Sequence, residues 1–163
     1  MKVGIITVSD KGSQGLREDL SGPAIKDAIC RDTPWRVSST AIIPDEKDQI
    51  SAQIIEMADQ EGCDLIFTTG GTGLSPRDVT PEATRAVVDR EIPGIAEAMR
   101  MGSMKNKKSA ILSRAIAGTR GKSLMINLPG SPRAVKECLE IIMPVIAHAL
   151  EVLQKGSAEC GND

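Results

Sequence analysis

Aromatic and histidine residues are nearly absent from this sequence. Its 163 residues include one tryptophan, one phenylalanine, no tyrosine and one histidine. Proteins that bind single-stranded nucleic acid stack bases on several aromatic side chains, so this composition argues against a nucleic-acid partner. A single histidine also argues against histidine-based catalytic triads and histidine-rich metal centres. The core must therefore be built from aliphatic side chains.

Cysteine motifs and an excess of one charge are also missing. The four cysteines, Cys30, Cys63, Cys138 and Cys160, are far apart and form no C-x-x-C pair. This spacing favours free thiols over disulfides or a zinc site. The 20 Lys and Arg residues nearly balance the 22 Asp and Glu residues, for a formal net charge of -2. A charged ligand must therefore be bound by local groups, because the overall charge would attract neither nucleic acid nor a membrane surface.

Long hydrophobic runs are absent as well. No segment reaches the roughly 18 consecutive apolar residues of a membrane-spanning helix. The start of the chain, MKVGIITVSD, has one lysine and too short an apolar run for a signal peptide. We therefore expect a cytoplasmic protein with no membrane partner. The length predicts a single domain over residues 1–156 and a disordered tail over residues 157–163.

The pattern of apolar residues alternates between short buried strands and amphipathic helices. Strands are predicted over residues 2–9, 35–43 and 64–69. Helices are predicted from Ser21 or Gly22 to about residue 31, from Asp45 to a stop at Gly62, and from a cap at Thr80 to about residue 89. This order predicts an α/β fold with a mainly parallel sheet covered by helices on both faces.

The last third of the chain has a different pattern. A further helix is predicted over residues 94–104, and residues 110–130 are predicted to contain two strands that form a hairpin around an Arg120-Gly121 turn. Residues 132–155 have strong helical periodicity, although Pro144 removes a backbone donor and predicts a kink.

Three loops that follow predicted strands, residues 10–19, 70–78 and 129–131, contain glycine, serine and charged residues where core residues would otherwise stand. In a parallel sheet these loops gather at one edge, where ligands usually bind. The GGTG segment of the second loop exposes backbone amides that suit phosphate oxygens. It is neither a Walker loop nor a dinucleotide fingerprint, because no Gly-Lys-Ser/Thr follows and Pro76 stands in place of a third glycine. By spacing alone, it is equally consistent with a tight turn.

Two aspartates near predicted helix starts, Asp45 and Asp78, each have two interpretations. They can stabilise the positive end of a helix, and Asp78 can pair with Arg77. Alternatively, their carboxylates face the glycine amides and hold Mg²⁺ against phosphate oxygens. Asp10 and Asp19 flank a polar loop as solvated charges.

An ordered set of motifs runs through the chain: IPDE at residues 43–46, TTGGTG at 68–73, PRDVTPEAT at 76–84, LSR at 112–114, AGTRG at 117–121 and NLPGSP at 127–132. This series resembles the molybdenum cofactor biosynthesis family, specifically the MogA and MoaB proteins and the G domains of plant and animal molybdenum-insertion proteins. The resemblance covers essentially the whole chain, from the first strand to the final helix.

The resemblance implies a three-layer α/β/α sandwich with a mostly parallel sheet and a small antiparallel hairpin, a homotrimer, and molybdopterin adenylylation. In that reaction the terminal phosphate of molybdopterin attacks the α-phosphate of ATP and releases pyrophosphate, with Mg²⁺ required. It implies that Asp78 and Asp45 are the catalytic residues and the Mg²⁺ ligands. It also implies the following substrate- and nucleotide-binding residues: Thr69, Gly70, Gly71, Thr72, Gly73, Ser113, Arg114, Lys122, Pro129, Gly130 and Ser131.

Other functions stay open at this point. A catalytically silent paralogue or scaffold of the same family would bind molybdopterin without activating it. A phosphoryl-transfer enzyme of another family is disfavoured because the chain has no Walker lysine. The resemblance further implies that the product can pass to a molybdate-inserting protein.

Overall fold

The computed structural model describes residues 1–155 and contains one six-stranded sheet. The strand order is β2-β1-β3-β6-β5-β4. β2, β1, β3 and β6 run parallel, while β5 is antiparallel to both of its neighbours. The strands are β1 (Lys2–Val8), β2 (Arg36–Ile43), β3 (Leu65–Thr69), β4 (Arg90–Glu91), β5 (Ala117–Arg120) and β6 (Ser123–Leu128).

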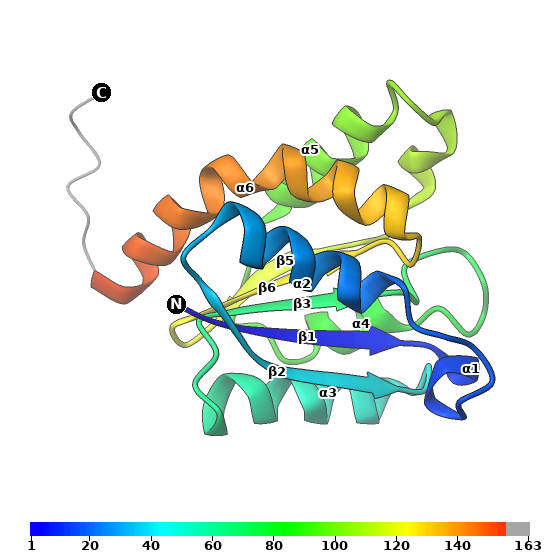
Figure 1. Ribbon diagram of the computed structural model, residues 1–163, viewed down its shortest axis with the longest axis horizontal. Helices are drawn as coiled ribbons and strands as arrows, with labels where there is room; N and C mark the ends of the chain where they lie inside the picture. The colour runs from blue at the N-terminus through cyan, green and yellow to red at the C-terminus, as the bar shows by residue number, and fades with distance from the viewer. Residues whose placement is uncertain (156–163) are drawn as a thin grey trace.

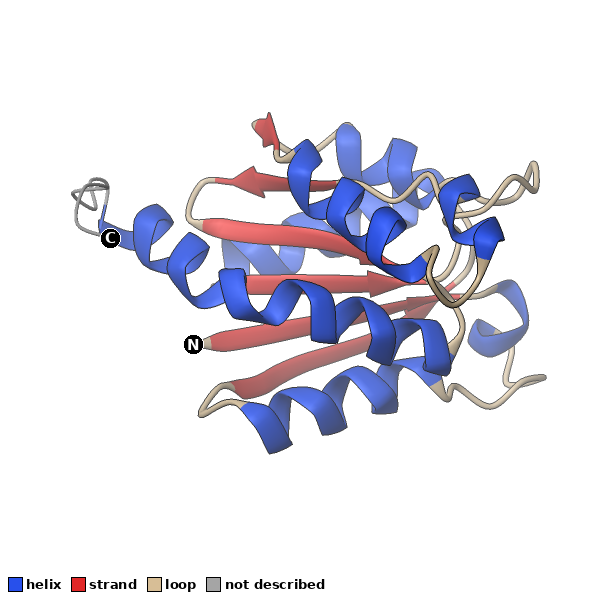
Figure 2. Cartoon of the chain, turned by 90° about the horizontal axis from the view of Figure 1, so that it is seen from above, coloured by secondary structure: helices blue, strands red, loops and turns tan. Residues whose placement is uncertain are grey.

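Helices cover both faces of this sheet (Figure 1 and Figure 2). The helical elements are α1 (Asp10–Ser13), α2 (Ser21–Asp32), α3 (Lys47–Ile55), the π-helical turn η1 (Glu56–Gln60), α4 (Thr80–Arg85), α5 (Pro93–Ser103), the 3₁₀ turn η2 (Lys108–Leu112) and α6 (Pro132–Lys155). In Figure 1, α5 and α6 lie above the sheet, α2 crosses in front of it and α3 lies below it; α2, α5 and α6 share one core.

Alternating side chains of the central strands build two separate cores. Ile5 and Phe67 face α2, α5 and α6, whereas Ile6 and Ile66 face α3 and α4. Successive residues of a strand therefore contribute to different cores, as expected because their side chains point to opposite faces of the sheet. The predicted three-layer α/β/α sandwich is therefore confirmed.

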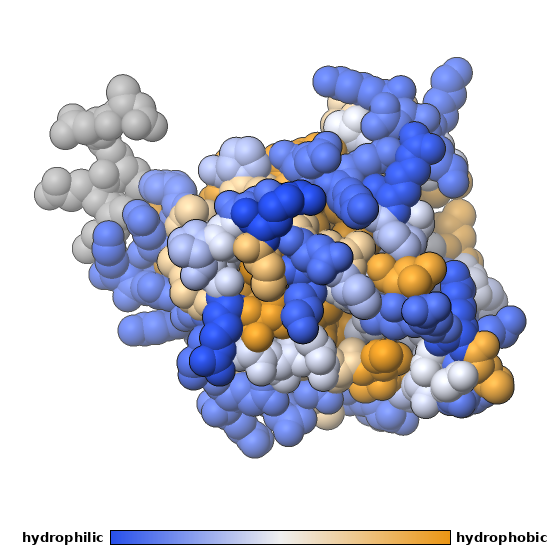
Figure 3. Space-filling view, viewed as in Figure 1, coloured by the Kyte–Doolittle hydropathy of each residue, from blue (hydrophilic) through white to orange (hydrophobic). Residues whose placement is uncertain are grey.

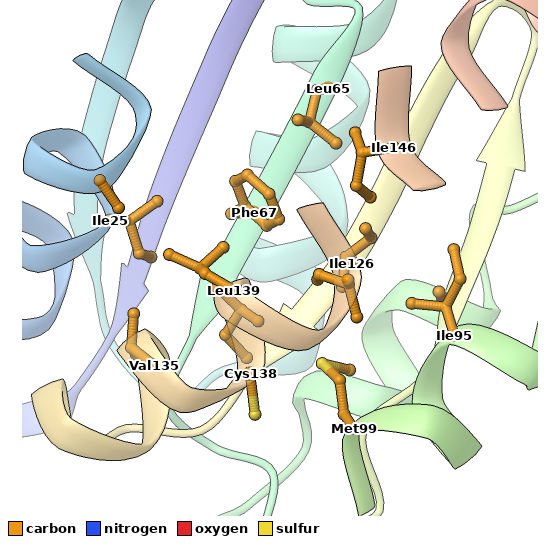
Figure 4. Packing of buried hydrophobic residues seen from close by; sticks show 14 of the residues in the cluster. Ile25, Leu65, Phe67, Ile95, Met99, Ile126, Val135, Cys138, Leu139 and Ile146 are labelled. Atoms are coloured by element: carbon orange, nitrogen blue, oxygen red, sulfur yellow. The ribbon is translucent and has the colours of Figure 1, made fainter. Parts of the chain in front are cut away.

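The core between the sheet and helices α2, α5 and α6 is packed almost entirely with aliphatic side chains. Phe67 on β3 is fully buried, and Figure 4 shows it among aliphatic side chains from the sheet and the covering helices. Cys138 of α6 and Met99 of α5 lie at the border of the same cluster. Sulfur-containing side chains adapt to irregular gaps, so they complete a core that has almost no rings.

The face of the molecule seen in Figure 3 carries mostly hydrophilic side chains, with apolar patches between them. No helix within the described residues is long and apolar enough to cross a membrane. Cys30, Cys63 and Cys138 are free, as predicted, while Cys160 and the predicted tail lie outside the described residues.

Several predicted boundaries need correction. The helix predicted from Asp45 begins at Lys47 and ends as a π-helical turn, and the helix predicted to reach residue 89 ends at Arg85. A 3₁₀ turn covers Lys108–Leu112, so the hairpin starts at Ala117 and not near residue 110. The predicted hairpin turn after Arg120 is confirmed. The one-turn helix α1 was not predicted, because a segment of four residues has no periodicity to detect.

Candidate active site

The three glycine- and serine-containing loops gather at one edge of the sheet, as the sequence predicted. β1, β3 and β6 are parallel neighbours, so their carboxyl ends lie together. Two side chains then join the loops: Thr69 Oγ1 donates a hydrogen bond to the carbonyl of Pro129 (2.8 Å), and Ser21 Oγ donates to the carbonyl of Gly130 (2.8 Å). The hydroxyl of Thr69, a predicted binding residue, is thus engaged within the protein.

The glycine loop leaves three backbone N–H groups available. Gly70 and Gly71 have positive φ values of 98° and 63°, which only glycine adopts easily. The N–H of Gly70 donates to the carbonyl of Leu128 at 3.3 Å. Within the described residues, the N–H groups of Gly71, Thr72 and Gly73 have no acceptor. Successive free amides in a glycine turn form a concave site that favours anions.

Thr80 holds this loop in place. Its hydroxyl donates to the carbonyl of Gly70 (2.9 Å), and its N–H donates to the carbonyl of Gly71 (3.1 Å). A Cβ atom at Gly71 would collide with the same hydroxyl. α4 begins at Thr80, as predicted, but the prediction that Thr80 caps it is wrong: the Thr80 side chain turns toward the glycine loop, and Val79 occupies the cap position.

Asp45 is linked to Asp10 by two reciprocal hydrogen bonds. The N–H of Asp10 donates to Asp45 Oδ2 (2.8 Å), and the N–H of Asp45 donates to Asp10 Oδ1 (3.1 Å). Burial raises the pKa of Asp45, and the neighbouring charges of Asp10 and Asp78 raise it further. The hydrogen bond from Arg77 lowers the pKa of Asp10. A carboxylate among other carboxylates is best stabilised by a cation.

Asp78 lies at the other end of the glycine loop. Its Oδ2 accepts a hydrogen bond from the N–H of Ser75 (2.8 Å), and a Cβ atom at Gly73 would be 2.8 Å from the same oxygen. Asp78 does not form the pair with Arg77 that was one interpretation of the sequence. Arg77 instead forms ion pairs with Asp10 (2.9 Å) and Glu46 (2.8 Å). The carboxylates of Asp45 and Asp78 therefore border the glycine loop without a cationic partner in the described residues.

A cavity of about 400 Å³ opens beside this loop. Its wall is mainly apolar, as in most ligand pockets. The site residues predicted from the sequence that line it are Thr72, Gly73, Ser113, Pro129, Gly130 and Ser131. Further lining residues come from the end of the glycine loop and from α5, η2, α6 and the segments beside them: Leu74, Ala96, Met99, Arg100, Ser103, Lys107, Ser109, Ala110, Leu112, Ala115, Ala134, Glu137 and Cys138. The amino terminus of α6 follows Ser131 directly and favours an anion there.

Arg114, also a predicted binding residue, is engaged within the protein. Its guanidinium forms an ion pair with Glu82 and donates hydrogen bonds to the carbonyls of Asp78 and Gly73, the latter at 2.6 Å. Its N–H donates to the carbonyl of Thr72 at 3.0 Å. Arg114 therefore braces the glycine loop, which means that its hydrogen bonds hold the backbone of the loop in place.

Lys122 does not join the site. It lies in the turn between β5 and β6, at the amino end of β6, whereas the cavity borders the carboxyl end of that strand. The neighbouring Arg120 forms an ion pair with Asp59. The family resemblance implied a binding role for Lys122, but the turn of the β5–β6 hairpin lies at the edge of the sheet opposite the cavity.

A smaller hollow of about 100 Å³ lies on the β1 side of the same edge and shares Gly130 with the large cavity. Asp19 lines it and accepts hydrogen bonds from the N–H groups of Ser21 (2.9 Å) and Gly22 (3.0 Å). Asp19 therefore caps the backbone N–H groups at the start of α2. The sequence had suggested only a solvated charge.

The contribution of α5 to the cavity was not predicted from the sequence. Arg100 lies on the helix surface between Ala96 and Ser103, both buried. Residues four and three apart share one helix face, so an arginine at this position borders the apolar stripe. An arginine beside the apolar stripe of the predicted helix was the sequence feature that could have indicated a role for Arg100.

Comparisons with known proteins place the chain in a family. Residues 4–148 match the model of a family described as a probable molybdopterin binding domain. The chain is 45% identical to molybdopterin adenylyltransferase from Helicobacter pylori J99, over 93% of this chain and 86% of that protein. It is 42% identical to molybdopterin adenylyltransferase from Escherichia coli K12, over 86% and 72% of the two chains.

Solved structures show the same fold. The crystal structure of the molybdopterin biosynthesis enzyme MoaB from Thermus thermophilus has a TM-score of 0.89 and 48% identity, covering 94% of this chain and 96% of that one. A structure of MogA has a TM-score of 0.88 and 35% identity, covering 94% and 99%. The chain therefore belongs to the molybdenum cofactor biosynthesis family.

Proposed function

We propose that this protein is a molybdopterin adenylyltransferase, which transfers AMP from ATP to the phosphate of molybdopterin and releases pyrophosphate. The observation that supports this most directly is the juxtaposition of three free amides, at Gly71, Thr72 and Gly73, with the carboxylates of Asp45 and Asp78. Both the H. pylori and the E. coli relatives carry this activity in their names.

The two carboxylates fit Mg²⁺. The described residues contain no group of three or more His, Cys, Asp and Glu side chains able to hold a metal ion. Mg²⁺, however, commonly takes one or two carboxylates and completes its shell with water and substrate phosphates. Asp45 and Asp78 each use Oδ2 to accept a backbone hydrogen bond, which leaves Oδ1 available. When bound, Mg²⁺ would neutralise charge on the transferring phosphates.

The protein's own part in the reaction is alignment. An oxygen of the molybdopterin phosphate attacks the α-phosphorus of ATP, and the bond from that phosphorus to the oxygen of the leaving pyrophosphate breaks. The free amides of the glycine loop orient phosphate oxygens and stabilise the charge that develops on them. Thr80 and Arg114 fix the loop, so these donors need no rearrangement when the substrates bind.

The assembly and setting of the protein belong to the same proposal. We propose a homotrimer in the cytoplasm that passes adenylylated molybdopterin to a molybdate-inserting protein, on the basis of the family resemblance. Light scattering on the purified chain should give three times the monomer mass. A monomer at micromolar concentration would remove the trimer from the proposal.

Adenylyl transfer is the test of the proposed activity. Purified protein is incubated anaerobically with molybdopterin, ATP and Mg²⁺, and pyrophosphate and adenylylated pterin are quantified. Wild type should form both products, and Asp78→Asn should keep the fold but lose at least a hundredfold in rate, roughly the cost of removing one preorganised electrostatic group. Tight molybdopterin binding without any product would identify a silent paralogue.

A further inference from the structure

The large cavity has two cationic residues in its lining, Arg100 and Lys107. Neither was expected from the sequence motifs, which pointed to Arg114 and Lys122. Those two residues cannot serve the cavity: Arg114 braces the glycine loop, and Lys122 is at the opposite edge of the sheet.

Arg100 is half-buried on α5, and two backbone carbonyls hold its guanidinium. Nη1 donates to the carbonyls of Ser113 (3.3 Å) and Ala115 (3.1 Å). Across residues 1–155, no carboxylate forms an ion pair with Arg100. Glu137, the acidic residue in the cavity lining, pairs with Arg133 instead. The positive charge at Arg100 thus remains without a counter-charge.

The free donors of Arg100 suit a phosphate group. Its Nε and Nη2 atoms have no acceptor in the part of the chain that the structure describes. Two neighbouring guanidinium N–H groups match two oxygens of one phosphate, and a charge-assisted pair of this kind is stronger than a neutral hydrogen bond. A partly desolvated cation without a partner is costly, so a ligand anion would also relieve that cost.

The rest of the cavity fits an attached ring. Ala96, Met99 and Ala110 contribute apolar surface, and the amino end of α6 begins next to Ser131. Lys107 is exposed at the same cavity, with Lys105 and Lys108 near it in the chain. This local run of lysines would attract anionic ligands by long-range electrostatics, although the chain as a whole is slightly acidic.

We propose that Arg100, with Lys107 in the lining of the same cavity, binds a phosphate group of the substrate that occupies this cavity. The inference rests on the proposed function, because that function supplies two phosphorylated substrates, molybdopterin and ATP. Their shared chemistry is a phosphate attached to a heterocycle, and binding measurements distinguish the two sources.

The experiment measures dissociation constants calorimetrically on the full chain for ATP, adenosine, molybdopterin and dephosphorylated molybdopterin, the pterins under anaerobic conditions. Three variants are compared with wild type. Arg100→Met removes the charge, and Arg100→Lys keeps the charge but lacks the two adjacent N–H donors of the guanidinium. The third variant is Arg31→Met. Arg31 is the matched control, because it is an exposed arginine paired with Asp32 at the far end of α2.

Arg100→Met should raise the dissociation constant of one phosphorylated ligand by about 10- to 100-fold, the range for a lost hydrogen bond to a charged group. Its phosphate-free analogue should be affected much less. Arg100→Lys should give an intermediate loss, and Arg31→Met should match wild type. A loss confined to molybdopterin assigns the pterin phosphate, and a loss confined to ATP assigns the nucleotide.

Two results would overturn the inference: unchanged affinity in Arg100→Met, or equal losses for phosphorylated and phosphate-free ligands, which would show that Arg100 only supports the cavity wall. These measurements need no turnover. Arg100-dependent phosphate binding without adenylyl transfer would therefore contradict the proposed activity and leave this inference standing.

Discussion

Arg114 donates a hydrogen bond to the backbone carbonyl of Asp78 and none to its carboxylate. The arginine thus fixes the position of the aspartate without neutralising it. Because the same guanidinium reaches the carbonyl of Gly73, one side chain spans the loop between the free amides and the acidic group.

Arg114→Met should therefore weaken both stability and catalysis. We expect the unfolding free energy to fall by about 1–3 kcal/mol, since two partly buried carbonyls lose a charged donor, and adenylyl transfer to fall at least tenfold. Urea denaturation and steady-state kinetics measure the two effects. Arg85→Met is the control, because its ion pair with Glu91 is exposed and should contribute little to stability. Wild-type turnover in the Arg114 variant would show that the loop keeps its shape without the brace.

Asp45→Asn should raise the Mg²⁺ concentration needed for half-maximal turnover by at least tenfold. The amide oxygen can still accept the hydrogen bond from the N–H of Asp10, so the fold should persist while a charged metal ligand is lost. A Mg²⁺ titration of the rate, after treatment with EDTA, measures the shift. Full activity of the EDTA-treated wild type would rule out the metal altogether. Asp27→Asn, at an exposed position on α2, should behave as wild type.

Gly71→Ala should destabilise the protein by about 1–2 kcal/mol or more, because its φ of 63° disfavours any side chain and a Cβ atom would meet the Thr80 hydroxyl. Gly94→Ala is the opposite case. It lies in α5 with open space around the added methyl group, and should stabilise by about 0.5–1 kcal/mol. Thermal unfolding of both variants gives the comparison, and equal effects would refute the strain argument.

Asn127→Leu should cost about 2–4 kcal/mol. The buried side chain of Asn127 accepts a hydrogen bond from the N–H of Ile116 (3.2 Å) and donates to the hydroxyls of Thr68 (2.9 Å) and Thr84 (2.8 Å), so leucine leaves the buried N–H unsatisfied. Chemical denaturation measures the loss. The exposed Asn106→Leu should change stability by less than about 0.5 kcal/mol, and a similarly small effect at Asn127 would contradict the role of the network.

Cys138 should react slowly with iodoacetamide near neutral pH. Burial raises the pKa of its thiol, and because the thiolate is the nucleophile, its alkylation needs a higher pH than that of an ordinary cysteine. Mass spectrometry should find Cys30 modified well before Cys138, and a ligand in the cavity should slow Cys138 further. Equal rates at both positions would show that the cavity wall opens readily.

Sequence periodicity predicted the sheet and most of its helices because burial decides their pattern directly. Alternating residues such as Ile5 and Ile6 face different cores, and both are apolar because both faces are covered. The end of α4 was harder to predict, since the chain leaves that helix at Arg85 only to form the short edge strand β4. That strand is defined by pairing with β5, a contact distant in sequence.

The site was predicted in its chemistry more than in its contacts. The glycine loop and its two neighbouring aspartates were located from motifs and strand ends, and the structure does bring them together. The partners of the arginines were not predictable. Arg77 pairs with Asp10, and Arg114 donates to the carbonyl of Gly73. These contacts depend on tertiary distances that no local sequence pattern contains.

The antiparallel pairing of β5 with β6 links the folding of this hairpin to the cavity. Since β5 runs against β6, the segment before β5 and the segment after β6 meet at one edge, and Ala115 and Pro129 both line the cavity. Two walls of the cavity thus belong to a single hairpin. Local unfolding of that hairpin would remove both walls at once, so ligand binding and protection of the hairpin amides from exchange are one linked equilibrium.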